Sequence, residues 1–73
     1  EALVPVSPEV VFRKGIYEQM VGEVKNWLEQ KETITVAEAR DHFDSSRRYM
    51  LAFLEHLDSR GITIREGDVR RLR

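Results

Sequence analysis

The chain has 73 residues, of which 41% are apolar and 34% charged, and its formal net charge is −1. This length fits one domain and cannot hold two independent cores, and the composition excludes a disordered or membrane-embedded chain. Because cysteine is absent, a disulfide framework, a thiolate metal site and a cysteine nucleophile are excluded too. The longest apolar run, residues 49–54, is far shorter than the roughly 20 residues that cross a bilayer. We therefore expect a cytoplasmic monomer with no membrane partner.

Basic residues are unevenly distributed along the chain. Residues 1–43 contain five Lys and Arg against eight acidic residues, whereas residues 44–73 contain seven Arg, no Lys and five acidic residues. This bias matters because the planar guanidinium group suits phosphates and base edges better than a lysine ammonium group does. The second part of the chain is therefore where we expect an anionic partner to bind.

The first 30 residues predict an extended segment and then a helix. Residues 1–12 contain β-prone residues interrupted by Pro5 and Pro8, so they form either short strands or an arm laid against the domain. From about residue 13 to 30, apolar residues recur at intervals of three and four, which is typical of one helix face. The residues of this face are Ile16, Met20, Val24, Trp27 and Leu28, flanked by Tyr17 and Val21.

Two shorter helices follow. Residues 33–36 are all β-branched and predict a very short strand, and Thr35 with Glu38 forms the pattern of a capping box that begins a helix over residues 36–43. Residues 44–46 provide three candidate N-cap side chains in a row before a third helix. Gly61 is placed to end this helix in a left-handed conformation.

The end of the chain predicts a β-hairpin over residues 62–72. Two short runs flank Gly67 and Asp68, and a glycine in the first of two turn positions suits a type II′ turn. The order of elements predicts an α+β fold, a small winged helix, in which a helix-turn-helix with three helices carries a β-hairpin wing. Residues 1–73 then form a single domain, which we expect to be a terminal module of a longer protein because it begins with Glu1. The expected core residues are Trp27, Phe43, Phe53, Leu54 and Leu57.

No catalytic set is apparent in the sequence. The histidines, His42 and His56, lie on different predicted helices and form a poor metal site without cysteine, so we expect both to be solvated surface groups. The four glycines are scattered, which excludes a phosphate-binding glycine loop. We therefore expect neither an enzyme nor a bound metal or cofactor.

The start of the third helix is the main candidate site. Serine and arginine side chains there can hold a phosphate beside the unpaired backbone amides and partial positive charge of a helix N-terminus. The first turn of a recognition helix is also the part that contacts nucleic acid. The alternative is that a serine only caps the helix, that the arginines are solvated and that Tyr49 lies against Phe53. The candidate residues are Ser45, Ser46, Arg47, Arg48 and Tyr49.

The predicted wing extends this candidate site. Arg65 and Arg70 lie on strands that pair across the turn, so the hairpin can present them together, whereas Arg71 faces the other way. Cross-strand ion pairs with Glu66 or Asp68 are the alternative for each of these arginines.

A third group of cations begins the first helix. Arg13 and Lys14 are unfavourably placed with respect to the helix dipole. This placement indicates an anion supplied from outside the chain, so we include both residues in the candidate binding site.

Four motifs, in this order, resemble the last winged-helix domain of the bacterial selenocysteine-specific elongation factor family, SelB. The resemblance covers residues 33–73 well and the earlier residues more loosely. Any one motif is weak alone, because winged helices share their hydrophobic pattern, but the combination is specific. The motifs are ITVAEAR at 34–40, SRRY at 46–49, LEHLDSRGIT at 54–63 and REGDVR at 65–70.

The resemblance implies an RNA-binding role. In that family the last of a string of winged-helix modules binds the selenocysteine insertion sequence (SECIS), an mRNA hairpin beside an in-frame UGA codon, while an amino-terminal GTPase carries selenocysteinyl-tRNA. This chain would be the carboxy-terminal tether, with the mRNA stem-loop and a neighbouring winged-helix module of the same chain as its partners. Residues 45–49 would hold the loop end and an extruded base, and Arg65, Arg70 and Arg71 would contact the RNA backbone.

Two other readings remain open. A DNA-binding winged helix would read bases with side chains near residues 47, 48 and 51, and apolar Leu51 fits that role poorly. A protein-docking module would instead expose an apolar patch around Val4, Val6 and Val11.

Overall fold

The computed structural model describes residues 2–73, and this part of the chain forms three helices and two small antiparallel sheets. The class predicted from the sequence, an α+β winged helix, is confirmed. The elements are β1 (Leu3–Pro5), β2 (Val11–Arg13), α1 (Lys14–Lys31), β3 (Ile34–Thr35), α2 (Val36–Phe43), α3 (Arg47–Ser59), β4 (Thr63–Glu66) and β5 (Val69–Leu72). None of the helices in residues 2–73 is long and apolar enough to cross a membrane.

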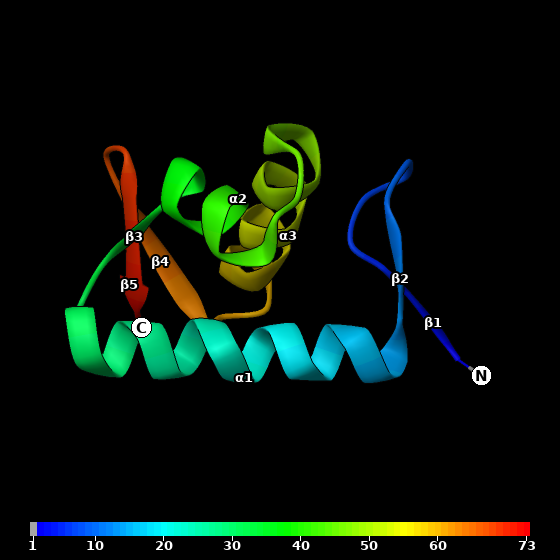
Figure 1. Ribbon diagram of the computed structural model, residues 1–73, viewed down its shortest axis with the longest axis horizontal. Coiled ribbons are helices and arrows are strands. Elements are labelled where there is room, and N and C mark those ends of the chain that lie inside the picture. The colour runs from blue at the N-terminus through cyan, green and yellow to red at the C-terminus, as the bar shows by residue number, and fades with distance from the viewer. Residues whose placement is uncertain (1) are drawn as a thin grey trace.

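Helix α1 forms the base of the domain (Figure 1). Above it lie α2, α3 and the three-stranded sheet, while β1 and β2 rise from the N-terminal end of α1. Three tips point away from α1: the turn between β1 and β2, the first turn of α3 and the turn between β4 and β5. The predicted recognition helix thus begins between two hairpins, which we call the N-terminal hairpin (residues 3–13) and the wing (residues 63–72).

The core lies between α1 and the other two helices. Phe53, Leu54 and Leu57 are fully buried, as predicted. Trp27 and Phe43 are only partly buried, contrary to the prediction, and they pack against the edge of the core. Trp27 stays near the surface because its indole Nε1 donates a hydrogen bond of 2.9 Å to the carbonyl of Thr33, which closes the turn after α1.

The buried stripe of α1 consists of Met20, Val24 and Leu28. Ile16, predicted on the same face, is 50% exposed instead. Helix α1 extends past the core at its start, so the apolar stripe there has less to cover it. Ile16 therefore lines an open cleft, which is described below.

The helix-turn-helix is defined by its caps. Thr35 Oγ1 accepts a 3.0 Å hydrogen bond from the amide of Glu38, whose carboxylate accepts one of 2.9 Å from the amide of Thr35, so the predicted capping box is present. Asp44 ends α2 in a left-handed conformation with φ 50°. Of the three candidate caps for α3, Ser46 is the one used, since its Oγ accepts from the amide of Tyr49 at 3.1 Å.

The wing sheet has the strand order β3-β5-β4. Its turn places Gly67 at φ 62° while Asp68 keeps a negative φ, which matches the predicted type II′ turn. Strand β5 pairs with β3, so the wing is joined directly to the start of α2. Gly61, with φ 74°, has the predicted left-handed conformation just after α3.

The N-terminal residues form two paired strands, which decides between the alternatives left open by the sequence. Val6 and Val10 are buried at the turn of this hairpin. Phe12 packs edge-on against Phe53 with ring centroids 5.8 Å apart. The hairpin is therefore held to α3 by apolar contacts.

The sequence suggested that both histidines are solvated surface groups, but in the structure each of them contacts another helix. His56 is half-buried, and its Nε2 lies 2.9 Å from the hydroxyl of Tyr17, which joins α3 to α1. His42 is exposed but pairs with Glu23 of α1 at 2.9 Å and packs edge-on against Trp27. Each histidine thus links two helices across the edge of the core.

Candidate nucleic-acid interface

The first turn of α3 carries positive charge on an exposed surface. Arg47 and Arg48 are exposed, and this turn contains no acidic residue. Ser46 caps the helix, so its hydroxyl already serves the α3 backbone. The arginines therefore add to the positive end of the helix dipole and make this tip attractive to anions.

Arg47 is placed between α3 and the wing. It lines a cleft of about 350 Å³ together with Arg65 of β4 and Arg70 of β5. We call this space the arginine cleft. Its other lining residues are Thr35, Val36, Ala37, Leu51 and Asp68.

Arg48 and Tyr49 turn toward the N-terminal hairpin instead. Arg48 forms an exposed ion pair with Glu9. Tyr49 is 46% exposed and lies beside Val11 and Phe12 rather than against Phe53. The predicted residues at the start of α3 therefore do not share one surface, since Arg47 faces the wing and Arg48 and Tyr49 face the N-terminal hairpin.

The sequence predicted that the wing presents Arg65 and Arg70 together, but in the structure Arg70 is buried. The two residues are direct partners in the β4–β5 register, as expected, but Arg70 is only 2% exposed. Its Nε donates to Asp58 Oδ2 at 3.2 Å, and Thr63 Oγ1 donates to Asp58 Oδ1 at 2.6 Å. Arg70 faces α3, where the partly buried carboxylate of Asp58 neutralises it, whereas Arg65 is exposed to solvent and its Nε donates to the carbonyl of Gly67.

Arg71 lies on the other face of the wing. It pairs with Glu66 at 3.1 Å, and both side chains are about half exposed. This is the cross-strand ion pair that the sequence offered as the alternative to RNA contact. Arg71 is therefore separated from the arginine cleft by the wing itself.

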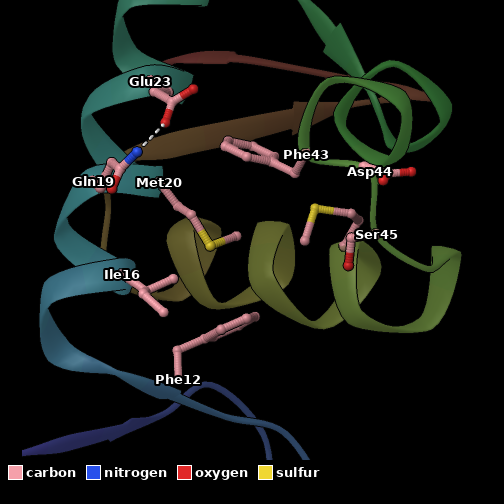
Figure 2. Close-up of a pocket in the computed structure, with 9 residues that line it drawn as sticks. Phe12, Ile16, Gln19, Met20, Glu23, Phe43, Asp44 and Ser45 are labelled. Atoms are coloured by element: carbon pink, nitrogen blue, oxygen red, sulfur yellow. Dashed lines mark hydrogen bonds between the residues drawn. The ribbon is translucent and has the colours of Figure 1, made fainter.

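Ser45 is half-buried and faces a second cleft, on the α1 side of the turn between α2 and α3 (Figure 2). Figure 2 shows Ser45 and Asp44 across from Ile16, Gln19 and Glu23 of α1, with the rings of Phe12 and Phe43 between them. This cleft has a volume of about 310 Å³, and apolar and polar side chains line it in similar measure. Ser45 thus lies apart from Arg47 and Arg65.

Arg13 and Lys14 are exposed at the foot of the N-terminal hairpin. The start of α1 lies on the side of the domain opposite the first turn of α3 (Figure 1). The structure therefore does not bring these two cations together with the other candidate residues.

The groups with shifted pKa values lie away from the arginine cleft. Partial burial, together with the nearby charge of Arg60, lowers the pKa of His56 below its ordinary value. A hydrogen bond from His42, with a smaller contribution from Gln19, lowers the pKa of Glu23. Residues 2–73 contain no group of three or more His, Asp or Glu side chains that could hold a metal ion.

Several residues of this surface were not identified from the sequence. Glu9, the partner of Arg48, is 39 residues away along the chain. The walls of the arginine cleft at Thr35, Val36 and Ala37 come from the start of α2. The capping box located that start, but the β3–β5 pairing that brings it beside the wing is a tertiary feature.

The helix-turn-helix, the β-hairpin wing and the basic first turn of α3 define the chain as a winged-helix domain. The family described as "Elongation factor SelB, winged helix" matches residues 26–72. The selenocysteine-specific elongation factor of Desulfomicrobium baculatum is 31% identical over 71 residues, which are 97% of this chain and 11% of that protein. The chain therefore belongs to the family of SelB winged-helix domains.

A solved structure has the same fold. It is the mRNA-binding domain of elongation factor SelB from E. coli in complex with SECIS RNA, and it matches with a TM-score of 0.88 and 20% sequence identity. The match covers 97% of this chain and 59% of the solved chain. This chain thus spans a small part of the curated relative and somewhat over half of the solved one.

Proposed function

We propose that this domain binds an mRNA hairpin of the SECIS type and tethers a selenocysteine-specific elongation factor to its message. The observation that carries the proposal is that Arg47 at the start of α3 and Arg65 of the wing line one cleft in a domain of the SelB family. The solved SelB domain of the same fold is described in complex with SECIS RNA. The domain itself needs no catalytic group for this role, and GTP hydrolysis is assigned to another part of the full-length factor.

The geometry suits a hairpin loop better than a duplex groove. The major groove of duplex RNA is too deep and narrow for a recognition helix, so sequence-specific proteins read loops and unstacked bases. Here the first turn of α3 lies between two hairpin tips, so a rounded loop end can contact all three at once (Figure 1). Arg48 and Tyr49 lie on the N-terminal hairpin side, and we infer that they contact an extruded base by hydrogen bonding and stacking.

The wing and the start of α3 supply the backbone contacts in this proposal. Arg47 and Arg65 are exposed guanidinium groups, which bind phosphate in a planar, two-pronged geometry. Holding the message in this way raises the local concentration of the tRNA that the factor carries. A neighbouring winged-helix module of the same chain is the second partner that we propose.

The rival readings find less support in this surface. A major-groove helix needs polar side chains along its outer face, yet Leu51 is apolar and half-buried. A docking patch around Val4, Val6 and Val11 is reduced by the burial of Val6, although Val11 is 51% exposed.

The test is fluorescence anisotropy with three labelled nucleic acids across a salt series. These are an RNA hairpin with a bulged or extruded base near its loop, the same hairpin without that base, and a DNA duplex. The proposal predicts tight binding to the first and a loss of at least about tenfold for the other two. Equal, weak and steeply salt-dependent binding to all three would mean generic attraction, and preference for the duplex would mean a DNA-binding domain.

A further inference from the structure

The arginine cleft contains more cationic groups than its acidic residues neutralise. Arg47 has no hydrogen-bond or ion-pair partner among residues 2–73, and Arg65 uses only its Nε, on the carbonyl of Gly67. Of the lining residues only Asp68 is acidic, and Asp58 is already shared by Arg70 and Thr63. An anion entering the cleft would therefore meet guanidinium groups with free donors on two sides.

Arg70 lines the same cleft and has a donor without a partner in residues 2–73. Its side chain is 2% exposed, and its Nη2 is buried with no hydrogen-bond partner among the described residues. Burying an unpaired donor of a charged group is unfavourable, so a ligand oxygen at this position would relieve a cost already present in the folded domain. Because Asp58 holds Nε, the plane of the guanidinium group is set before any ligand arrives.

The start of α2 closes the third side of the cleft. Val36 and Ala37, the first two residues of this eight-residue helix, line the space. The capping box uses the amides of Thr35 and Glu38, so the amides of the first two helical residues have no partner within the helix. The positive end of the α2 dipole therefore faces the same space as the three arginines.

We propose that the arginine cleft is a subsite for one backbone phosphate of the bound RNA, shared between α3 and the wing. Arg47 and Arg65 close on it from either side, and Arg70 fixes its depth. This inference rests on the proposed RNA binding and adds that the two exposed arginines serve the same phosphate. The phosphate thereby fixes the angle at which the hairpin meets the first turn of α3.

A double-mutant cycle distinguishes one shared phosphate from two separate ones. The variants are Arg47→Gln, Arg65→Gln and both together, each titrated with the labelled RNA hairpin at several salt concentrations. We expect each single variant to bind about tenfold more weakly and the double variant to lose less than about threefold more. The slope of log K against log salt concentration should fall by about 0.7 to 0.9 in total for the double variant, which is the change expected for the loss of one phosphate contact.

The matched control pairs Arg47→Gln with Arg71→Gln. Arg71 lies on the opposite face of the wing, so any losses in this pair should multiply independently. If the losses in affinity for Arg47→Gln and Arg65→Gln multiply, and each substitution lowers the salt slope separately, the shared subsite is wrong although the proposed RNA binding still stands. If the unchanged protein does not bind the hairpin at all, the proposed function and the subsite both fail.

A methylphosphonate scan of the hairpin gives an independent readout. Replacing each phosphate in turn with a neutral methylphosphonate should reveal one position that weakens binding by about tenfold. At that position the Arg47→Gln, Arg65→Gln double variant should be affected less than twofold. If no single position behaves in this way, and removal of the extruded base abolishes the coupling between the two arginines, the cleft holds a base and the phosphate assignment is wrong.

Discussion

The two hairpins that flank α3 are attached to it by different means. The wing is held by the ion pair between Arg70 and Asp58, with Thr63 bonded to the second carboxylate oxygen. The N-terminal hairpin is held by apolar contacts around Phe12, and its only ion pair to α3 in the described residues, Arg48 with Glu9, lies on the surface.

This difference assigns different roles to the two sides of the proposed RNA site. The largely buried ion pair between Arg70 and Asp58 fixes the wing against α3. The position of Arg65 relative to the start of α3 is therefore well defined. An exposed pair is weak and easily exchanged for another partner. Arg48 can therefore leave Glu9 for RNA at little cost, which makes the hairpin side the adjustable one.

Removing the carboxylate of Asp58 should have the largest effect. Asp58→Ala leaves the buried guanidinium of Arg70 without its counterion, and we expect a loss of about 3 kcal/mol in the free energy of unfolding. Denaturant unfolding followed by circular dichroism measures it. The control is Asp68→Ala at the exposed wing tip, and an equally small change in both variants would show that the wing is not anchored by the ion pair.

Replacing both arginines at the start of α3 should mainly affect binding. We expect Arg47→Ala with Arg48→Ala to weaken hairpin binding by at least about tenfold, or about 1.4 kcal/mol. Thermal stability should be nearly unchanged because both side chains are exposed. The charge-matched control removes Arg13 and Lys14 from the far side of the domain, and equal losses in the two variants would mean that net charge rather than position governs affinity.

The contact between α1 and α3 beneath both hairpins should give a moderate dependence on pH. The pKa of His56 is lowered in the folded domain, so the unfolded chain binds more protons just below the ordinary value of 6.5. The free energy of unfolding should therefore rise as the pH increases toward 6.5 and level off above it. Melting temperatures between pH 5 and 8 should show this rise in the unchanged protein and a flatter profile in His56→Gln; parallel profiles would contradict the assignment.

The exposed pair on the adjustable side should contribute least. Glu9→Ala removes the partner of Arg48, and we expect the free energy of unfolding to change by less than about 1 kcal/mol. The same variant should bind the hairpin as well as or better than the unchanged protein, since Arg48 is then free. A stability loss as large as that of Asp58→Ala would remove the distinction between the two hairpins.

Local signals in the sequence predicted the elements well. The Thr35–Glu38 capping box, the Ser46 cap and the Gly67 turn each depend on residues within a few positions of one another. Such features form wherever the local chain allows them, so they can be read without knowledge of the tertiary structure. The winged-helix order followed from them.

The partners of the arginines could not be predicted in the same way. Strand alternation placed Arg65 and Arg70 on one face of the wing, but not which of them would be covered by α3. That outcome depends on Asp58, 12 residues before Arg70, whose carboxylate makes burial of a guanidinium group tolerable. Trp27 was assigned to the core for a related reason, since its hydrophobic position was readable and its hydrogen bond to Thr33 was not.

A titration of the ¹⁵N-labelled domain with the RNA hairpin, followed by NMR chemical shifts, tests the central claim most directly. The account predicts that the largest shifts occur in residues 46–49 and 65–68, with the side-chain signals of Arg47 and Arg65 changing together. The start of α1 and the cleft beside Ile16 should change little. Largest shifts at Ile16 and Phe43, or on the outer face of the N-terminal hairpin at Leu3 and Val11, would place the RNA elsewhere and contradict the account.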